Sequence, residues 1–118
     1  MYRTMLFHGE IASLNEAKGF GTVIIGTTKT LFYLKDGCRL SSFKRKGTIV
    51  LEFLRLDTPI TPRIGERIIC LRPHVSQAVH KWTTNQGYED FVQKICGPDA
   101  EIPSVSTFAK NYLAEIAR

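Results

Sequence analysis

The sequence predicts an α+β protein, in which a small β-barrel of five short strands precedes a short helical region. Up to Pro73, apolar runs of strand length are separated by glycine-rich or proline-rich turns. After Pro73, apolar residues recur at intervals of three and four, which is the spacing of one helix face. We therefore divide the chain into a barrel, residues 1–73, and a helical extension, residues 74–118.

Five segments of the first part predict strands, because each is a short apolar or alternating run bounded by turn residues. They cover residues 5–14, 19–26, 29–37, 47–57 and 66–73. The basic segment RLSSFKRKG and the proline-punctuated segment TPITPRIG are predicted as connecting loops. Five short strands without an intervening helix pattern predict a closed or partly closed barrel.

Three amphipathic stripes predict short helices in the extension. The residues of the first stripe are Val75, Ala78, Val79 and Trp82. The second stripe covers residues 88–96 and is stopped by Gly97 and Pro98. The third covers residues 104–118.

Composition narrows the class of protein. A chain of 118 residues with 43% hydrophobic residues has enough apolar material for one folded domain, and widespread disorder is not expected. No apolar run approaches the roughly 20 residues that span a bilayer, and the first ten residues lack a secretory pattern. Three widely spaced cysteines indicate a reduced protein. We therefore expect a cytoplasmic protein that does not bind membranes.

The positive charge is concentrated in the first part of the chain. Residues 1–73 contain 12 lysines and arginines against six acidic residues, whereas residues 74–118 contain four against five. A basic region of this kind favours an acidic partner such as nucleic acid. We therefore expect the first part, and not the extension, to contact phosphate groups.

The segment GEIASLNEAKGFGTVI, followed by LFYLKDG, resembles a cold-shock domain. This family has a five-stranded barrel of the OB type and binds single-stranded RNA and DNA. The match runs through Asn15 and the Lys18-Gly19-Phe20-Gly21 motif, and Gly47 fits the glycine that opens the fourth strand of the family. The resemblance covers about residues 5–72 and implies that this chain binds single-stranded nucleic acid, with RNA favoured over DNA.

The resemblance also implies which residues contact the strand. Phe20 and Phe32 take positions of base-stacking aromatic residues, and Phe43 stands for an aromatic residue of a loop. Cations near these positions are expected to contact phosphates. They are Lys18, Lys35, Arg39, Lys44, Arg45 and Lys46.

Several contact residues of the family are exchanged in this chain. Ser13 stands in place of a tryptophan, Thr22 in place of a stacking phenylalanine, and Leu34 in place of a histidine. One base stacked on an aromatic ring contributes about 1–3 kcal/mol, so these exchanges weaken the expected stacking. The lost stacking affinity could be replaced by contacts between basic residues and phosphates, or by a contact from Trp82 of the extension.

The exchanges leave a second function open. A face that has replaced aromatic and basic residues with aliphatic ones is suited to a protein partner or to a second copy of the chain. The helices of the extension offer another surface for such a contact. Alternation places Phe32 and Leu34 on one face and Leu31 and Tyr33 on the other, and it does not decide which face is exposed.

The sequence contains no recognisable catalytic or metal-binding motif. His8, His74 and His80 have no ligand spacing with a cysteine, and Glu89-Asp90 is typical of the first turn of a helix. We therefore expect a protein that is not an enzyme and needs no cofactor or metal. The predicted function is non-catalytic binding of single-stranded nucleic acid, and the alternative is a protein-interaction module.

Overall fold

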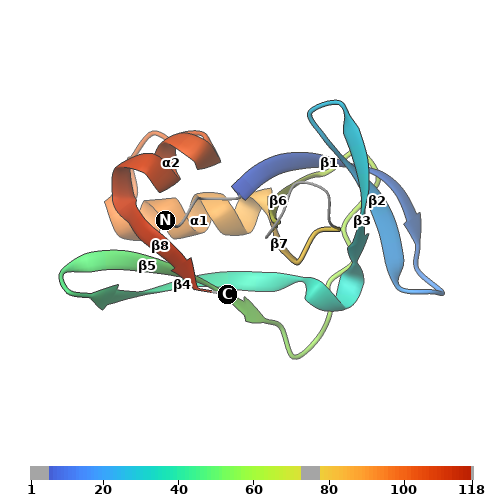
Figure 1. Cartoon of the computed structure of the whole chain (residues 1–118), viewed down its shortest axis with the longest axis horizontal. Helices are drawn as coiled ribbons and strands as arrows, with labels where there is room; N and C mark the ends of the chain where they lie inside the picture. Colours follow the sequence, from blue (N-terminus) through green and yellow to red (C-terminus); the bar gives the residue numbers. More distant parts are fainter. Residues whose placement is uncertain (1–5, 73–77, 118) are drawn as a thin grey trace.

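The computed structural model describes residues 6–72 and 78–117 of the chain. These residues form two β-sheets and two α-helices, so the α+β class is confirmed. Figure 1 shows the helices on one side of the molecule and strands β2 and β3 at the opposite end of its longest axis.

The larger sheet has five antiparallel strands in the order β3-β2-β1-β6-β7. Their bounds are β1 Leu6–Asn15, β2 Phe20–Ile25, β3 Thr28–Tyr33, β6 Arg67–Leu71 and β7 Lys81–Thr84. Strands β1, β2, β3 and β6 confirm four of the five predicted strand segments, and β5 of the smaller sheet, Thr48–Arg55, confirms the fifth. The register of β1 against β2 shifts between Ile11 and Ser13. The last strand, β7, comes from the predicted helical extension.

The smaller sheet has three strands in the order β4-β5-β8. Their bounds are β4 Cys38–Arg45, β5 Thr48–Arg55 and β8 Leu113–Ala117. The segment RLSSFKRKG, predicted as a loop, instead forms most of β4 and its turn into β5. Strand β8 pairs with β5 in parallel, so the predicted third helix is shorter than expected.

The expected closed barrel is wrong, because the strands form two sheets that do not close on each other. After β3 the chain turns through a short 3-10 helix, Leu34–Asp36, and continues into β4 from Gly37, whose backbone is extended. This turn directs β4 away from β3, and the β4–β5 hairpin extends toward the far end of the molecule (Figure 1). Strand β4 therefore pairs with β5 and not with the larger sheet.

Helix α1 covers Asn85–Cys96 and helix α2 covers Val105–Tyr112. The side-chain oxygen of Thr84 caps α1 by accepting a hydrogen bond from Gly87 N, and the helix ends where Gly97 adopts a φ of 112°. The helix contains the predicted stripe of residues 88–96, and its end at Gly97 agrees with the prediction. The first predicted helix is wrong over its described residues, because 78–80 are not helical and β7 pairs with β6. Val75 of that stripe lies outside the described residues.

Two clusters of buried side chains fill the interior. One lies between the helices and both sheets, and its members include Leu51, Phe53, Tyr88 and Phe108. The other lies against the larger sheet, where Trp82 packs among residues of β1, β2, β3 and β6. Both clusters contain residues from 6–72 and from 78–117, so the two predicted parts share one interior.

Candidate nucleic-acid interface

Strands β1, β2 and β3 present a surface on the side of the sheet opposite the buried cluster. In β2 and β3, Gly21, Val23 and Phe32 are buried, so the residues between them point outward. We define the outer face as these outward residues of the two strands. They are Phe20, Thr22, Ile24, Lys29, Leu31 and Tyr33.

Two aromatic residues lie side by side on the outer face. Phe20 and Tyr33 are direct partners in the antiparallel register of β2 and β3, and side chains in such pairs have Cβ atoms about 4.5–5.5 Å apart. Tyr33 is 38% exposed and Phe20 is half-buried. The pair therefore forms a small aromatic surface that solvent reaches.

The backbone beneath this aromatic pair is held from within. Trp82 Nε1 donates a hydrogen bond of 2.8 Å to the carbonyl oxygen of Tyr33. On the outside, the Nζ of Lys35 lies 5.8 Å from the centroid of the Tyr33 ring. Tyr33 thus has a fixed backbone and a cation beside its ring, and both favour a defined ring position.

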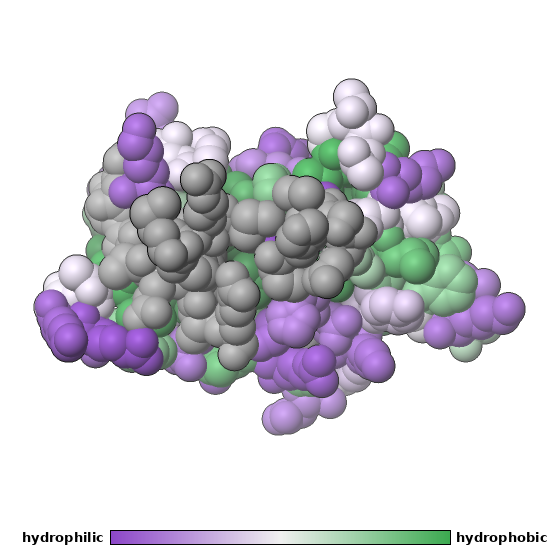
Figure 2. Space-filling view, viewed as in Figure 1, coloured by the Kyte–Doolittle hydropathy of each residue, from purple (hydrophilic) through white to green (hydrophobic). Residues whose placement is uncertain are grey.

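The rest of the outer face consists of aliphatic side chains and side chains with hydroxyl groups. Leu31 is 40% exposed and Ile24 is 36% exposed. The hydroxyl groups of Ser13 and Thr22 lie 2.6 Å apart and share a hydrogen bond. Figure 2 shows hydrophobic surface at this end of the molecule. The outer face therefore carries aromatic groups at one end and branched aliphatic groups at the other.

Cations surround the outer face, and acids accompany them. Lys18 lies exposed in the turn between β1 and β2, where its backbone N–H donates to Asn15 Oδ1 at 3.1 Å. Lys29 and Lys35 are exposed near the two ends of β3. Glu10, opposite Ile24 in the register, and Glu16 in the turn are also exposed. The positive charge around the face is therefore partly offset.

Phe32 is a core residue, which corrects its expected contact with bases. Its side chain is fully buried, and its ring meets that of Trp82 edge to face with centroids 5.7 Å apart. Gly21 is its partner in the register, and a Cβ at Gly21 would collide with the Phe32 ring. Leu34 is also buried. Tyr33, which the alternation did not single out, takes the exposed position.

The basic residues of the β4–β5 hairpin lie far from the outer face. Phe43, Lys44, Arg45 and Lys46 are at the tip of this hairpin, at the opposite end of the long axis from β2 and β3 (Figure 1). The guanidinium of Arg45 lies 5.3 Å from the centroid of the half-buried Phe43 ring. The structure therefore separates the predicted site into the outer face and a basic hairpin tip.

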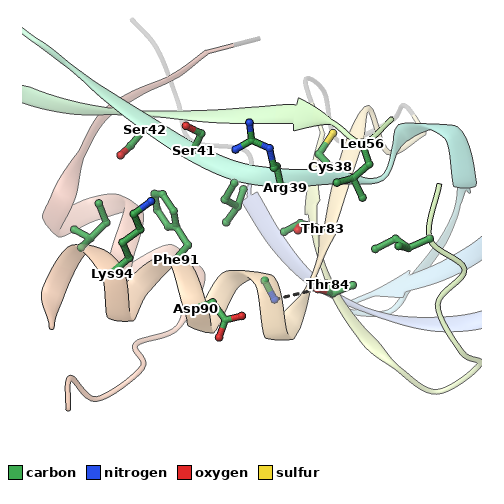
Figure 3. A pocket seen from close by; sticks show the side chains of 14 residues that line it. Cys38, Arg39, Ser41, Ser42, Leu56, Thr83, Thr84, Asp90, Phe91 and Lys94 are labelled. Carbon is green, nitrogen blue, oxygen red and sulfur yellow. Dashed lines mark hydrogen bonds between the residues drawn. The ribbon is translucent and has the colours of Figure 1, made fainter. Parts of the chain in front are cut away.

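Arg39 lies apart from both surfaces, near the start of β4. It lines a groove of about 520 Å³ between β4 and α1, together with Phe91 and Lys94 of the helix (Figure 3). Of the predicted contact residues, Lys18, Phe20 and Lys35 are therefore the three that the structure brings together.

Other reactive side chains of the described residues form no second site. Burial raises the pKa of Cys70 to about 12 and also raises that of Cys38, while Cys96 is exposed. Residues 6–72 and 78–117 contain no group of three potential metal ligands. Within those same residues, neither helix has the length and apolar character needed to cross a bilayer.

The chain was compared with protein-family models, curated proteins and solved structures. None of these three comparisons gives a match. The resemblance to cold-shock domains therefore rests on the segments GEIASLNEAKGFGTVI and LFYLKDG alone.

Proposed function

We propose that the protein binds single-stranded nucleic acid on the outer face, without catalysing a reaction. One observation carries this proposal: Phe20 and Tyr33 are cross-strand partners whose side chains share the outer face. An exposed aromatic surface on a β-sheet is how many proteins hold unpaired bases, because every base has a flat face that can stack. Two adjacent bases would stack on the two rings.

The surrounding lysines supply the second part of the interaction. Lys18 and Lys35 lie near the aromatic end of the face, and Lys29 lies near the other end of β3. At about 3.3 Å per residue, residues 29 to 33 span roughly 13 Å, which suits a short stretch of strand. The lysines would neutralise its phosphates, so the affinity should fall as salt is added.

The resemblance to cold-shock domains favours RNA over DNA as the natural strand. The same resemblance favours a role in the cytoplasm, on transcripts. The basic hairpin tip, with Lys44, Arg45 and Lys46, is too distant to contact the bases on the outer face, but a longer strand would reach both surfaces.

The test is a titration of fluorescein-labelled single-stranded RNA and DNA 12-mers, followed by fluorescence anisotropy at several salt concentrations. The double substitution Phe20→Ala/Tyr33→Ala should weaken binding by roughly 30- to 20,000-fold, since each of the two stacked bases contributes about 1–3 kcal/mol. Lys29→Gln and Lys35→Gln should each reduce the slope of log Kd against log salt by about 0.7.

The matched control for the aromatic pair is Phe43→Ala at the hairpin tip, which should leave the affinity for a 12-mer nearly unchanged. Equal losses in Phe43→Ala and in the double variant would contradict stacking on the outer face. Binding that depends on salt but not on Phe20 and Tyr33 would mean that charge alone holds the strand.

A protein-interaction module is the second candidate, because three of the exposed large apolar residues share the outer face. They are Ile24, Leu31 and Tyr33, each between 36% and 40% exposed. If the folded protein binds neither 12-mer at low salt, this candidate replaces the first. The partner surface would then be apolar and would bury these three side chains.

A further inference from the structure

The groove between β4 and α1 has one wall made by the edge of a strand. Five consecutive residues of β4, from Cys38 to Ser42, line it. Neighbouring residues of a strand point to opposite faces of the sheet, so a cavity on one face would meet only every second residue. A cavity that meets five in a row therefore lies along the edge of the strand.

The opposite wall is one face of α1. The helical residues that line the groove follow the three- and four-residue spacing of a single face. They are Gly87, Asp90, Phe91, Lys94 and Ile95. Figure 3 shows Phe91 and Lys94 pointing from α1 toward β4. The groove thus runs between a strand edge and a helix, and its volume is about 520 Å³.

The edge of β4 that faces this groove has backbone N–H and C=O groups that pair with no other described strand. Strand β4 is the outermost strand of its sheet, with β5 on its other side. A single bridge, between Gly37 and Trp82, occupies this side just before β4 begins. Over the following residues, 39–42, no described residue outside β5 pairs with the β4 backbone. Such an edge is a template for another strand.

We propose that an extended segment of a partner protein binds in this groove as an additional strand beside β4. Its backbone would donate to and accept from the free edge of β4, and its side chains would contact α1. This binding surface is separate from the outer face, and the proposal does not depend on the binding of nucleic acid.

The groove also specifies the side chains of the segment. An added strand places alternate side chains on the two faces of the sheet. On the inner face, Leu40 and Ile95 pack against the buried cluster that contains Phe91, so apolar side chains fit there. On the other face, Arg39 leaves β4 on the side away from α1 (Figure 3). An acidic side chain between the apolar ones would meet this cation.

The charges of β4 argue against a second copy as the occupant. Two β4 strands that paired antiparallel about their centres would place Arg39 of each copy opposite Lys44 of the other. Like charges opposite each other destabilise a strand pair. On the α1 wall, Asp90 and Lys94 place one exposed charge of each sign, so this wall does not favour a run of phosphates. A partner segment with acidic residues opposite Arg39 avoids the repulsion between two β4 strands.

The test uses synthetic peptides as probes on the full-length chain. A fluorescein-labelled, end-capped Glu-Val-Glu-Val-Glu-Val peptide should bind, as measured by anisotropy, and its Lys-Val counterpart should not. Methylation of alternate backbone nitrogens on the edge that faces β4 should abolish binding, because it removes the donors of the strand pairing. Arg39→Glu should weaken the acidic peptide by about fivefold or more and strengthen the basic one.

Controls separate this groove from the outer face. Lys29→Glu reverses an equally exposed charge on β3 and should leave peptide binding unchanged, as should Phe20→Ala/Tyr33→Ala. Circular dichroism of Arg39→Glu should match that of the wild type, because Arg39 is exposed.

Several outcomes would overturn the proposal. Equal affinity for the N-methylated peptide would show that no strand forms beside β4. If Arg39→Glu leaves the affinity for the peptide unchanged but Phe20→Ala/Tyr33→Ala weakens it, the peptide binds on the outer face. Displacement of the peptide by an RNA 12-mer would make the groove a nucleic-acid site. A dimer in sedimentation equilibrium that competes with the peptide would make the occupant a second copy. No binding of either peptide at millimolar concentrations would also end the proposal.

Discussion

Trp82 shows how a single residue of the second half of the chain shapes the candidate interface. It is fully buried, it packs edge to face on Phe32, and it donates a hydrogen bond to the Tyr33 carbonyl. Gly37 fits against its ring so closely that an added Cβ would lie 2.9 Å from Trp82 Cζ2. The position of Tyr33 therefore depends on a tryptophan that is remote in the sequence.

His8 should make the stability of the protein depend on pH. Its Nε2 accepts a hydrogen bond of 3.2 Å from the backbone N–H of Val105, at the start of α2. Burial, and secondly the positive charge of Arg67, lowers the pKa of His8 below 6.5. The folded protein thus prefers neutral His8, whereas the unfolded chain takes up a proton at higher pH. The stabilisation is complete above pH 6.5 and is lost as the pH falls toward the lowered pKa.

Urea unfolding at neutral pH and near pH 5 measures this effect. The wild type should lose more free energy of unfolding over this interval than His8→Gln, whose amide can still accept from Val105 N–H but does not titrate. The difference between the two proteins isolates the contribution of His8. If both proteins lose the same free energy of unfolding, either His8 stays neutral over this pH interval or its side chain is exposed to solvent in the folded protein.

Phe32 and Tyr33 show what the sequence determines at the scale of a residue. Strand β3 carries large apolar side chains on both faces, so alternation groups Phe32 with Leu34 but does not orient the pair. Its orientation depends on residues distant in the sequence, because Phe32 lies opposite Gly21 in the strand pair and its ring packs against that of Trp82. The positions of Lys18, Phe20 and Lys35 could be predicted from local sequence, since each lies in a turn, at a strand end or within a short motif.

At the scale of an element, the start of α1 depends on the Thr84 side chain. Its hydroxyl oxygen accepts from Gly87 N at 3.0 Å and satisfies one of the unpaired donors of the first helical turn. Thr84→Ala should therefore lower the free energy of unfolding by about 1 kcal/mol. Thr84→Ser keeps the hydroxyl, and chemical denaturation should place it near the wild type. Equal losses in both variants would attribute the effect to the methyl group.

Strands β4 and β7 show why some elements were misassigned. The stripe through Ala78, Val79 and Trp82 has helical spacing, yet residues 81–84 pair with β6 and bury Trp82. Pairing with a distant strand outweighs local spacing in so short a segment. The segment of β4 was predicted as a loop because it is rich in charged residues, namely Arg39, Lys44 and Arg45. Helix α1 was predicted well, since its apolar stripe and its terminal glycine are local signals.

At the scale of the whole molecule, the first 73 residues should not fold alone. The buried clusters need Trp82 of β7 and the helical residues Tyr88, Phe91 and Phe108. Removing residues 74–118 would expose the apolar side chains that these residues cover. The fragment 1–73 should therefore give the poorly dispersed NMR spectrum of an unfolded chain, in contrast to the full chain. A well-dispersed spectrum would establish an independent first domain.

The distribution of charge follows from the same arrangement. The excess of lysine and arginine belongs to the first part of the sequence, but the fold distributes these residues among the outer face, the hairpin tip and positions apart from both, such as Arg39. Net charge predicts an acidic partner without predicting one continuous binding surface. The separation arises because the chain turns through the 3-10 helix Leu34–Asp36, and no local pattern of charges contains that information.

The position of β1 at the centre of the larger sheet has a consequence for the order of folding. One neighbour, β2, follows it directly, but the other, β6, arrives only after the β4–β5 hairpin has been made. Closing such a long loop costs more entropy than forming a turn, so the pairing of β1 with β6 is a late step. During synthesis, we therefore expect β1 to remain unpaired on the side that later takes β6, and an unpaired strand edge of this kind favours aggregation.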